Sequence, residues 1–255
     1  MYRKLLIILM GALWMAFLSA PVFGQAKLLK FGLRGGLNLA KTTEENANVI
    51  VPVEDGIDVI ATSQIKNRTA FGLGGFIEFW VSSAFAIQVN GLYNQKGENV
   101  EIKLSSSFEP DPGTTVNITA DLEAALELTY FSFPVMGKFT FGKAQGIRPY
   151  LMAGPEIGFL SSAKTSDIEG TATFSVPSQG IYQTEDVNIP GEGIKDQMES
   201  VEFALNFGGG IAFPLGSSVE GFLDGRYGLG LSNILKEGED VKNNVIYLNL
   251  GLTFK

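Results

Sequence analysis

The last stretch of the chain, VIYLNLGLTFK at residues 245–255, indicates the fold class. From Ile246 onward, every second position carries a large apolar side chain: Ile246, Leu248, Leu250, Leu252 and Phe254. The positions between them are mostly small or polar, as in Asn249, Gly251 and Thr253. Because successive side chains of a β-strand point to opposite faces, the stretch predicts a strand with one apolar face and one small or polar face.

The same alternation recurs along the chain. It predicts eight strands, at about 29–40, 69–82, 84–97, 126–142, 147–160, 201–215, 218–232 and 243–254. Short turns at Ser82-Ser83, Gly142–Gly146 and Gly216-Ser217 alternate with long loops at 41–68, 98–125, 161–200 and 233–242. This layout predicts an all-β fold, an eight-stranded antiparallel up-and-down barrel with short turns at one end and long loops at the other.

The two faces of these strands differ in chemistry. One face is apolar and uncharged, and the other combines many glycines with ten charged side chains. A soluble, lipocalin-like barrel that binds a small apolar ligand would turn the apolar face inward, whereas a membrane barrel turns it outward. The interior of eight strands is too narrow for roughly 40 large apolar groups. We therefore favour a transmembrane barrel whose apolar face contacts lipid.

The N-terminus, MYRKLLIILMGALWMAFLSAPVFGQA, has the pattern of a secretory signal peptide. Arg3 and Lys4 precede an apolar run that is shorter than the roughly 20 residues of a membrane-spanning helix, and small residues follow it. We predict a signal peptide at 1–24 and a barrel domain at 25–255. The mature chain is then exported, and it meets any membrane through strands.

Composition excludes several classes of function. The net charge of −8 and the sequence pI of about 4.7 argue against nucleic-acid binding. The chain has no cysteine and no histidine, so thiol nucleophiles, the usual zinc sites and histidine-based triads are unavailable. We predict no catalytic residue, no metal and no cofactor. A histidine-independent, lipid-modifying outer-membrane enzyme is the less favoured alternative.

Four stretches resemble the PorT-like outer-membrane β-barrel proteins of Bacteroidota. They are FGLRGGLNLA at 31–40, YFSFPVMGKF at 130–139, PYLMAGPEIGFLSS at 149–162 and DGRYGLGLSNI at 224–234. The resemblance covers essentially the whole mature chain. It implies a bacterial outer-membrane barrel, and a structural or binding role accessory to secretion or envelope assembly.

The charged residues of the polar face must lie in the lumen if the apolar face meets lipid. We predict a lumen charge network that plugs the barrel, formed by Arg34, Glu78, Lys138, Arg148, Glu156, Glu202, Glu220, Asp224 and Arg226. The cations Arg34, Lys138 and Arg148 are expected to pair with Glu78 and Asp224, because an isolated buried charge is costly. A proton or ion path through the lumen is the alternative reading.

The long loops are the expected binding surface. Barrel convention places them outside the cell and both termini in the periplasm. Loops 41–68 and 161–200 exceed the length that a hairpin needs, so we expect them to bind a protein partner, and TATFSVPSQGIYQ at 171–183 to extend strands beyond the membrane. Their many acidic residues predict a solvated surface, with divalent-cation binding as the alternative. Outer-membrane lipid is the other expected partner, and we expect a monomer.

Overall fold

The computed structural model describes residues 29–53, 57–142 and 146–254, so the predicted signal peptide lies outside the described residues. Its strands are β1 (Leu29–Thr42), β2 (Ala47–Val53), β3 (Ile57–Trp80), β4 (Phe85–Asp111), β5 (Thr114–Thr140), β6 (Arg148–Thr165), β7 (Ile168–Val176), β8 (Ile181–Ile189), β9 (Val201–Pro214), β10 (Val219–Gly230) and β11 (Asn243–Phe254). Two short 3₁₀ turns, η2 (Pro177–Gln179) and η3 (Lys195–Gln197), interrupt them. Within these ranges, no helix is long and apolar enough to cross a membrane.

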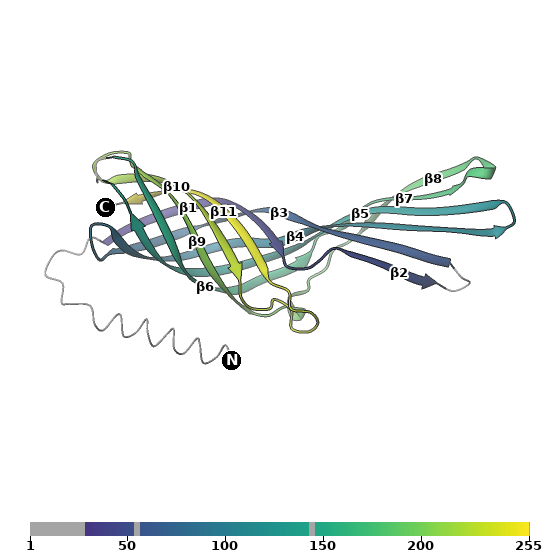
Figure 1. Cartoon of the computed structure of the whole chain (residues 1–255), viewed down its shortest axis with the longest axis horizontal. Coiled ribbons are helices and arrows are strands. Elements are labelled where there is room, and N and C mark those ends of the chain that lie inside the picture. Colours follow the sequence, from purple (N-terminus) through teal and green to yellow (C-terminus); the bar gives the residue numbers. More distant parts are fainter. Residues whose placement is uncertain (1–28, 54–56, 143–145, 255) are drawn as a thin grey trace.

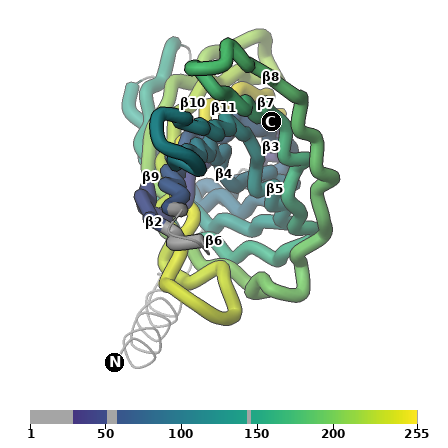
Figure 2. The backbone as a smooth tube through the Cα atoms, turned by 90° about the vertical axis from the view of Figure 1, so that its right-hand side faces the viewer, coloured from purple at the N-terminus to yellow at the C-terminus, as the bar shows by residue number. Residues whose placement is uncertain are grey.

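Eight of the strands close into a barrel (Figures 1 and 2). Around the ring they follow the order β1, β3, β4, β5, β6, β9, β10 and β11, and every neighbouring pair is antiparallel. The register of β1 against β11, from Phe31 opposite Phe254 to Thr42 opposite Asn243, closes the ring. The predicted eight-stranded antiparallel barrel is confirmed.

Burial separates the two faces of the barrel wall. On β11, Leu248, Leu250 and Leu252 are exposed on the outside, whereas Tyr247 and Asn249 are buried in the lumen. The other ring strands follow the same alternation, with most phenylalanine and leucine side chains outside and the charged and amide side chains inside, together with a few apolar ones such as Phe76 and Phe222. The apolar face of the opening stretch is therefore the outer surface, an arrangement that suits lipid as the surrounding solvent.

Three of the predicted loops are strands instead. In Figure 1, β3, β4 and β5 run well past the end of the barrel, and β2, β7 and β8 lie beside them. Pairing gives the order β2-β3-β4-β5-β7-β8, which we call the extension. The expectation of loops at 41–68, 98–125 and 161–200 was therefore wrong, except at 171–183, where the expected strands are largely present as β7 and β8. Residues 233–242 form a largely irregular loop. We call the end of the barrel from which the extension leaves the mouth.

The chemistry of the sheet inverts at the mouth. On β4 the lumen-facing side chains change from Asn94 and Lys96 to Ile102 and Leu104, while the outer face becomes polar from Lys103 onward. Strand β5 inverts in the same way, and a register shift in β3 between Asn67 and Gly72 keeps its face aligned with β4. This inversion is the pattern expected where water replaces lipid around the outer face of a barrel wall.

Gly97 lies at this change of chemistry. Its φ is 113°, and a Cβ at this position would come within 1.9 Å of the carbonyl oxygen of Leu126. We predict that Gly97→Ala lowers the free energy of unfolding in lipid vesicles by about 1–3 kcal/mol, because it adds a steric clash to an unfavourable backbone conformation. Gly113→Ala is the matched control, since Gly113 also has positive φ, 84°, but nothing lies near its would-be Cβ. Equal losses in the two variants would contradict the steric part of the prediction.

Candidate functional site: the lumen charge network and the mouth

The lumen contains a first level of ion pairs near the short turns. Lys138 Nζ lies 2.6 Å from Glu78 Oε1, and the Trp80 indole and Gln88 amide also donate to that carboxylate. Glu220 accepts from two cations, at 2.5 Å from Arg148 Nη2 and 3.0 Å from Lys30 Nζ. These side chains come from β1, β3, β4, β5, β6 and β10, so the level joins strands around the ring.

An apolar layer separates this level from a second one. Phe76, Met136, Tyr150, Met152, Ala212 and Phe222 form a buried cluster. Above it, Arg34 Nη2 lies 2.7 and 2.8 Å from the two carboxylate oxygens of Asp224, and Arg34 Nη1 donates to Asn90 Oδ1. The Tyr150 hydroxyl and the Asn249 amide donate to the same carboxylate, and Arg226 Nε lies 3.6 Å from it. Asp224 therefore holds the centre of the lumen together.

A third level lies below the mouth. Lys96 Nζ is 3.1 Å from Glu156 Oε1 and 3.1 Å from Glu202 Oε1, and it lies over the Tyr130 ring. The remaining oxygens of the two carboxylates accept from amides, Glu156 from Asn206 and Glu202 from Asn243. Each charge of this level thus has a partner of opposite sign, which offsets much of the cost of its burial.

An apolar cluster lies over these levels at the mouth. It consists of Leu128, Tyr130, Leu160, Ala163, Met198, Ile234 and Val241. Met198 and Ile234 come from the connections that precede β9 and follow β10, and the two segments are tied by a bridge between Met198 and Leu235. The long connections thus fold inward over the lumen on this side of the mouth.

The structure brings all nine residues of the predicted network into the lumen, within the three levels. Arg34 lies against Asp224, and Lys138 against Glu78, but Arg148 pairs with Glu220 rather than with Glu78 or Asp224. Strand stagger shifts heights around the ring, and counting residues from the turns does not capture it. The predicted network omitted Lys30 and Lys96, although both have the inward parity of Arg34 and Asn94 and could have been found from it.

The buried charges of the described residues balance. Six are cationic and six anionic: Lys30, Arg34, Lys96, Lys138, Arg148 and Arg226 against Glu78, Glu98, Glu156, Glu202, Glu220 and Asp224. Eleven of these twelve contact a charge of opposite sign, and Glu98 accepts from the Thr42 amide and hydroxyl. A balanced and largely paired interior favours a static plug over a path that attracts ions of one sign. In the same part of the chain, no group of three or more acidic side chains is placed to hold a metal ion.

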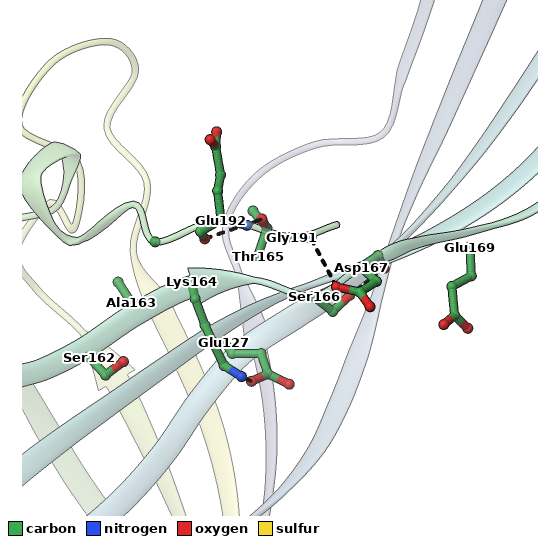
Figure 3. A pocket seen from close by; sticks show the side chains of 11 residues that line it. Glu127, Ser162, Ala163, Lys164, Thr165, Ser166, Asp167, Glu169, Gly191 and Glu192 are labelled. Carbon is green, nitrogen blue, oxygen red and sulfur yellow. Dashed lines mark hydrogen bonds and ion pairs between the residues drawn. The ribbon is translucent and has the colours of Figure 1, made fainter. Parts of the chain in front are cut away.

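Outside the barrel, charged side chains gather where β5 leaves β6 for β7. Glu127 is 2.9 Å from Arg68 Nη2 and 3.1 Å from Lys164 Nζ. Partial burial alone would raise the pKa of the Glu127 carboxyl, but the hydrogen bond from Lys164 and the charge of Arg68 lower it below its ordinary value. Figure 3 shows the adjoining open pocket, which is lined by polar side chains such as Ser162, Asp167 and Glu192. This charged rim lies just above the apolar outer band of the barrel.

The sequence profile of the family described as "Outer membrane protein beta-barrel domain" matches residues 20–236, most of the chain. No curated protein matches the chain.

Several solved structures of outer-membrane proteins resemble the chain weakly. Ail, the attachment invasion locus protein of Yersinia pestis, is 15% identical with a TM-score of 0.34, over 88% of this chain and 98% of that one. OprG from Pseudomonas aeruginosa is 12% identical with a TM-score of 0.35, over 89% and 96%. The outer membrane protease OmpT from Escherichia coli is 9% identical with a TM-score of 0.33, over 92% and 99%. Such low scores carry no argument about function.

Proposed function

The chain belongs to the outer membrane protein β-barrel domain family, and from this premise we propose that it is a non-enzymatic barrel with a plugged lumen that presents the extension as a binding surface outside the cell. The observation that carries the proposal is the extension itself. Strands β3, β4 and β5 continue beyond the mouth, and β2, β7 and β8 pair beside them there, although the barrel closes without these three. Long segments that the barrel does not need for closure are commonly functional.

The lumen supports the part of the proposal that concerns the plug. Three levels of paired charges and two apolar clusters fill it along the barrel axis. Eight strands leave little interior space beyond what side chains occupy. The paired carboxylates have cationic neighbours instead of a nucleophile, and the sequence has no histidine or cysteine to activate one. A plugged, non-catalytic barrel accounts for both features.

Orientation and partner complete the proposal. We place the extension outside the cell and the short turns and termini in the periplasm, following the convention for such barrels. The segments 41–68 and 161–200, expected to bind a protein, form the two flanks of the extension. A role accessory to secretion or envelope assembly, as the PorT-like resemblance implies, is the form of binding that we favour.

Two excisions test the binding role without disturbing the barrel. Thr165 N donates to Glu192 O at 2.9 Å, and Ile65 N donates to Asn46 Oδ1 at 2.8 Å, so the chain ends flanking each hairpin already meet. Removing 168–190 or 47–63 should leave heat-modifiable gel migration unchanged, because the ring pairings remain. In cross-linked native envelopes, we expect proteins attached to the intact chain to be lost from both variants.

If both excised variants retain the wild-type cross-linked partners and the wild-type phenotype of the cells, the hairpins are spacers. If one excised variant loses heat-modifiable migration, its barrel has not assembled. The other excised variant then serves as the test of the binding role.

A further inference from the structure

The face of the extension that continues the lumen surface is apolar. One row across the six strands reads Val49, Ala61, Leu104, Ala120, Ala172 and Glu185. The next row toward the tip on this face includes Val59, Ile118 and Phe174. Glu185, on the edge strand β8, is the one charged side chain of this face among the described residues that pair in the extension. We call this surface the apolar face.

The opposite face of the same strands is polar. The neighbouring row reads Ile50, Ile60, Ser105, Thr119, Thr173 and Thr184. A row nearer the barrel carries Lys103 and Asp121, paired at 3.3 Å with both side chains largely exposed. A sheet with one solvated and one apolar face normally packs its apolar face against another layer. Among the described residues, no second layer of strands or helices packs against the extension.

The size of the apolar face matches that of a specific protein interface. Six strands about 4.8 Å apart and seven residues about 3.3 Å apart make a sheet face of about 650 Å². Stable interfaces bury about 800 Å² on each partner, whereas the largest apolar patch of a typical monomer covers about 300–600 Å². The area therefore suits sheet-on-sheet packing against one partner of similar size.

Area and symmetry select the partner. The net charge of −8 makes two copies repel each other, so a contact between them needs a surface with few charges. The apolar face is such a surface, because Glu185 at its edge is its one charged side chain among the described residues of the extension. A second copy presents an identical apolar sheet of equal area, which a twofold-symmetric interface requires. We propose that the apolar face packs against the apolar face of a second copy of this chain, giving a homodimer in place of the monomer expected from the sequence and going beyond the binding role proposed above.

Leu104 and Ser105 provide a matched test, since they are neighbours on β4 with opposite faces. In mild detergent, light scattering of the purified full chain should give a dimer. Leu104→Lys should raise the dimer dissociation constant by roughly 100-fold or more, because each interface would bury two unpaired ammonium groups. Ser105→Lys should leave the dimer unchanged. Ile118→Ser, a milder change on the same apolar face, replaces Leu104→Lys if that variant loses heat-modifiable migration.

Single cysteines test the same surface in native membranes, because the chain has no cysteine of its own. Leu104 and Ser105 belong to opposite faces of β4, at the centre of the six strands, so Leu104 lies near the axis of a twofold-symmetric pair. A bismaleimide spanning about 10 Å, the spacing of packed sheets, should link Leu104→Cys into dimers but not Ser105→Cys. A monomeric wild-type chain in detergent, together with no dimer from Leu104→Cys in membranes, overturns the proposal. So does a Leu104→Cys product containing a different protein, which would assign the apolar face to that partner.

Discussion

Asp224→Ala is expected to lower the free energy of unfolding by about 3–5 kcal/mol, because it leaves buried arginine side chains without their carboxylate. Both carboxylate oxygens of Asp224 accept from Arg34 Nη2, and Asp224 also accepts from Tyr150 and Asn249. All three groups lose their acceptor together. Urea unfolding of the barrel in lipid vesicles measures the loss, and heat-modifiable migration should convert at a lower temperature.

Asp121→Ala is the control for this variant. Asp121 also pairs with a cation, Lys103, but both side chains lie in water on the extension. Removing an exposed pair should change the free energy of unfolding by no more than about 1 kcal/mol. A loss in Asp224→Ala as small as that in Asp121→Ala would mean that the central pair is hydrated and the lumen is open.

Planar-bilayer recording separates the plug from an ion path in the same set of variants. The wild-type barrel should show no steady conductance, and Glu78→Ala and Arg148→Ala should lower thermal stability without opening a channel. Glu78 holds Lys138, and Arg148 holds Glu220, so both variants unbalance the first level of the lumen. A steady wild-type conductance that either substitution alters would replace the plug with a conducting path.

The barrel could be predicted from the sequence because lipid demands a strict pattern. Every outward position of a membrane strand must be apolar, so Phe131, Phe133 and Val135 on β5 stand out against Ser132 and Pro134. The short turns then set the order of the strands, and the parity of each strand separates lumen from lipid. The ring of eight strands follows from these two observations.

The extension could not be predicted in the same way because its apolar side chains lie on the opposite face from those of the barrel strands. Beyond Gly97 the alternation keeps its period, as in Ile102, Lys103 and Leu104, but the apolar side chains now have the inward parity. A search for outward apolar positions therefore ends at the mouth, and acidic side chains such as Asp121 make the rest resemble solvated loops. Strands were expected only at 171–183, which β7 and β8 largely cover, and the strand structure of the other long segments was missed.

The lumen shows a different limit. Parity identifies which charged side chains point inward, and on that ground Lys30 and Lys96 were available to the prediction. Which charges meet depends on strand stagger and side-chain reach, as in Arg148, whose partner Glu220 lies on β10 rather than on β3. The alternation in the sequence identifies which charged residues belong to such a network, whereas which of them form ion pairs follows only from the three-dimensional structure.

The second large effect on the free energy of unfolding is expected on the apolar face of residues 245–255, which faces lipid in the proposed barrel. Leu250 lies near the middle of the outer face of β11, opposite Gly35 on β1 and Leu223 on β10, with 63% of its surface exposed. Leu250→Arg should lower the free energy of unfolding in lipid vesicles by about 2–4 kcal/mol, the cost of a cation near the bilayer midplane on a barrel surface. The yield of heat-modifiable barrel should fall with it.

Ile50 offers a control of equal exposure in a different solvent. It lies on β2 at the edge of the extension and is also 63% exposed, so Ile50→Arg removes a comparable apolar surface. Because water surrounds that face, the arginine stays hydrated and its cost should be within about 0.5 kcal/mol of zero. The difference between the two variants therefore measures the solvent rather than the side chain. If Leu250→Arg and Ile50→Arg are tolerated equally, the outer face of the barrel meets water, and the soluble, lipocalin-like alternative becomes the better account of the alternating strands.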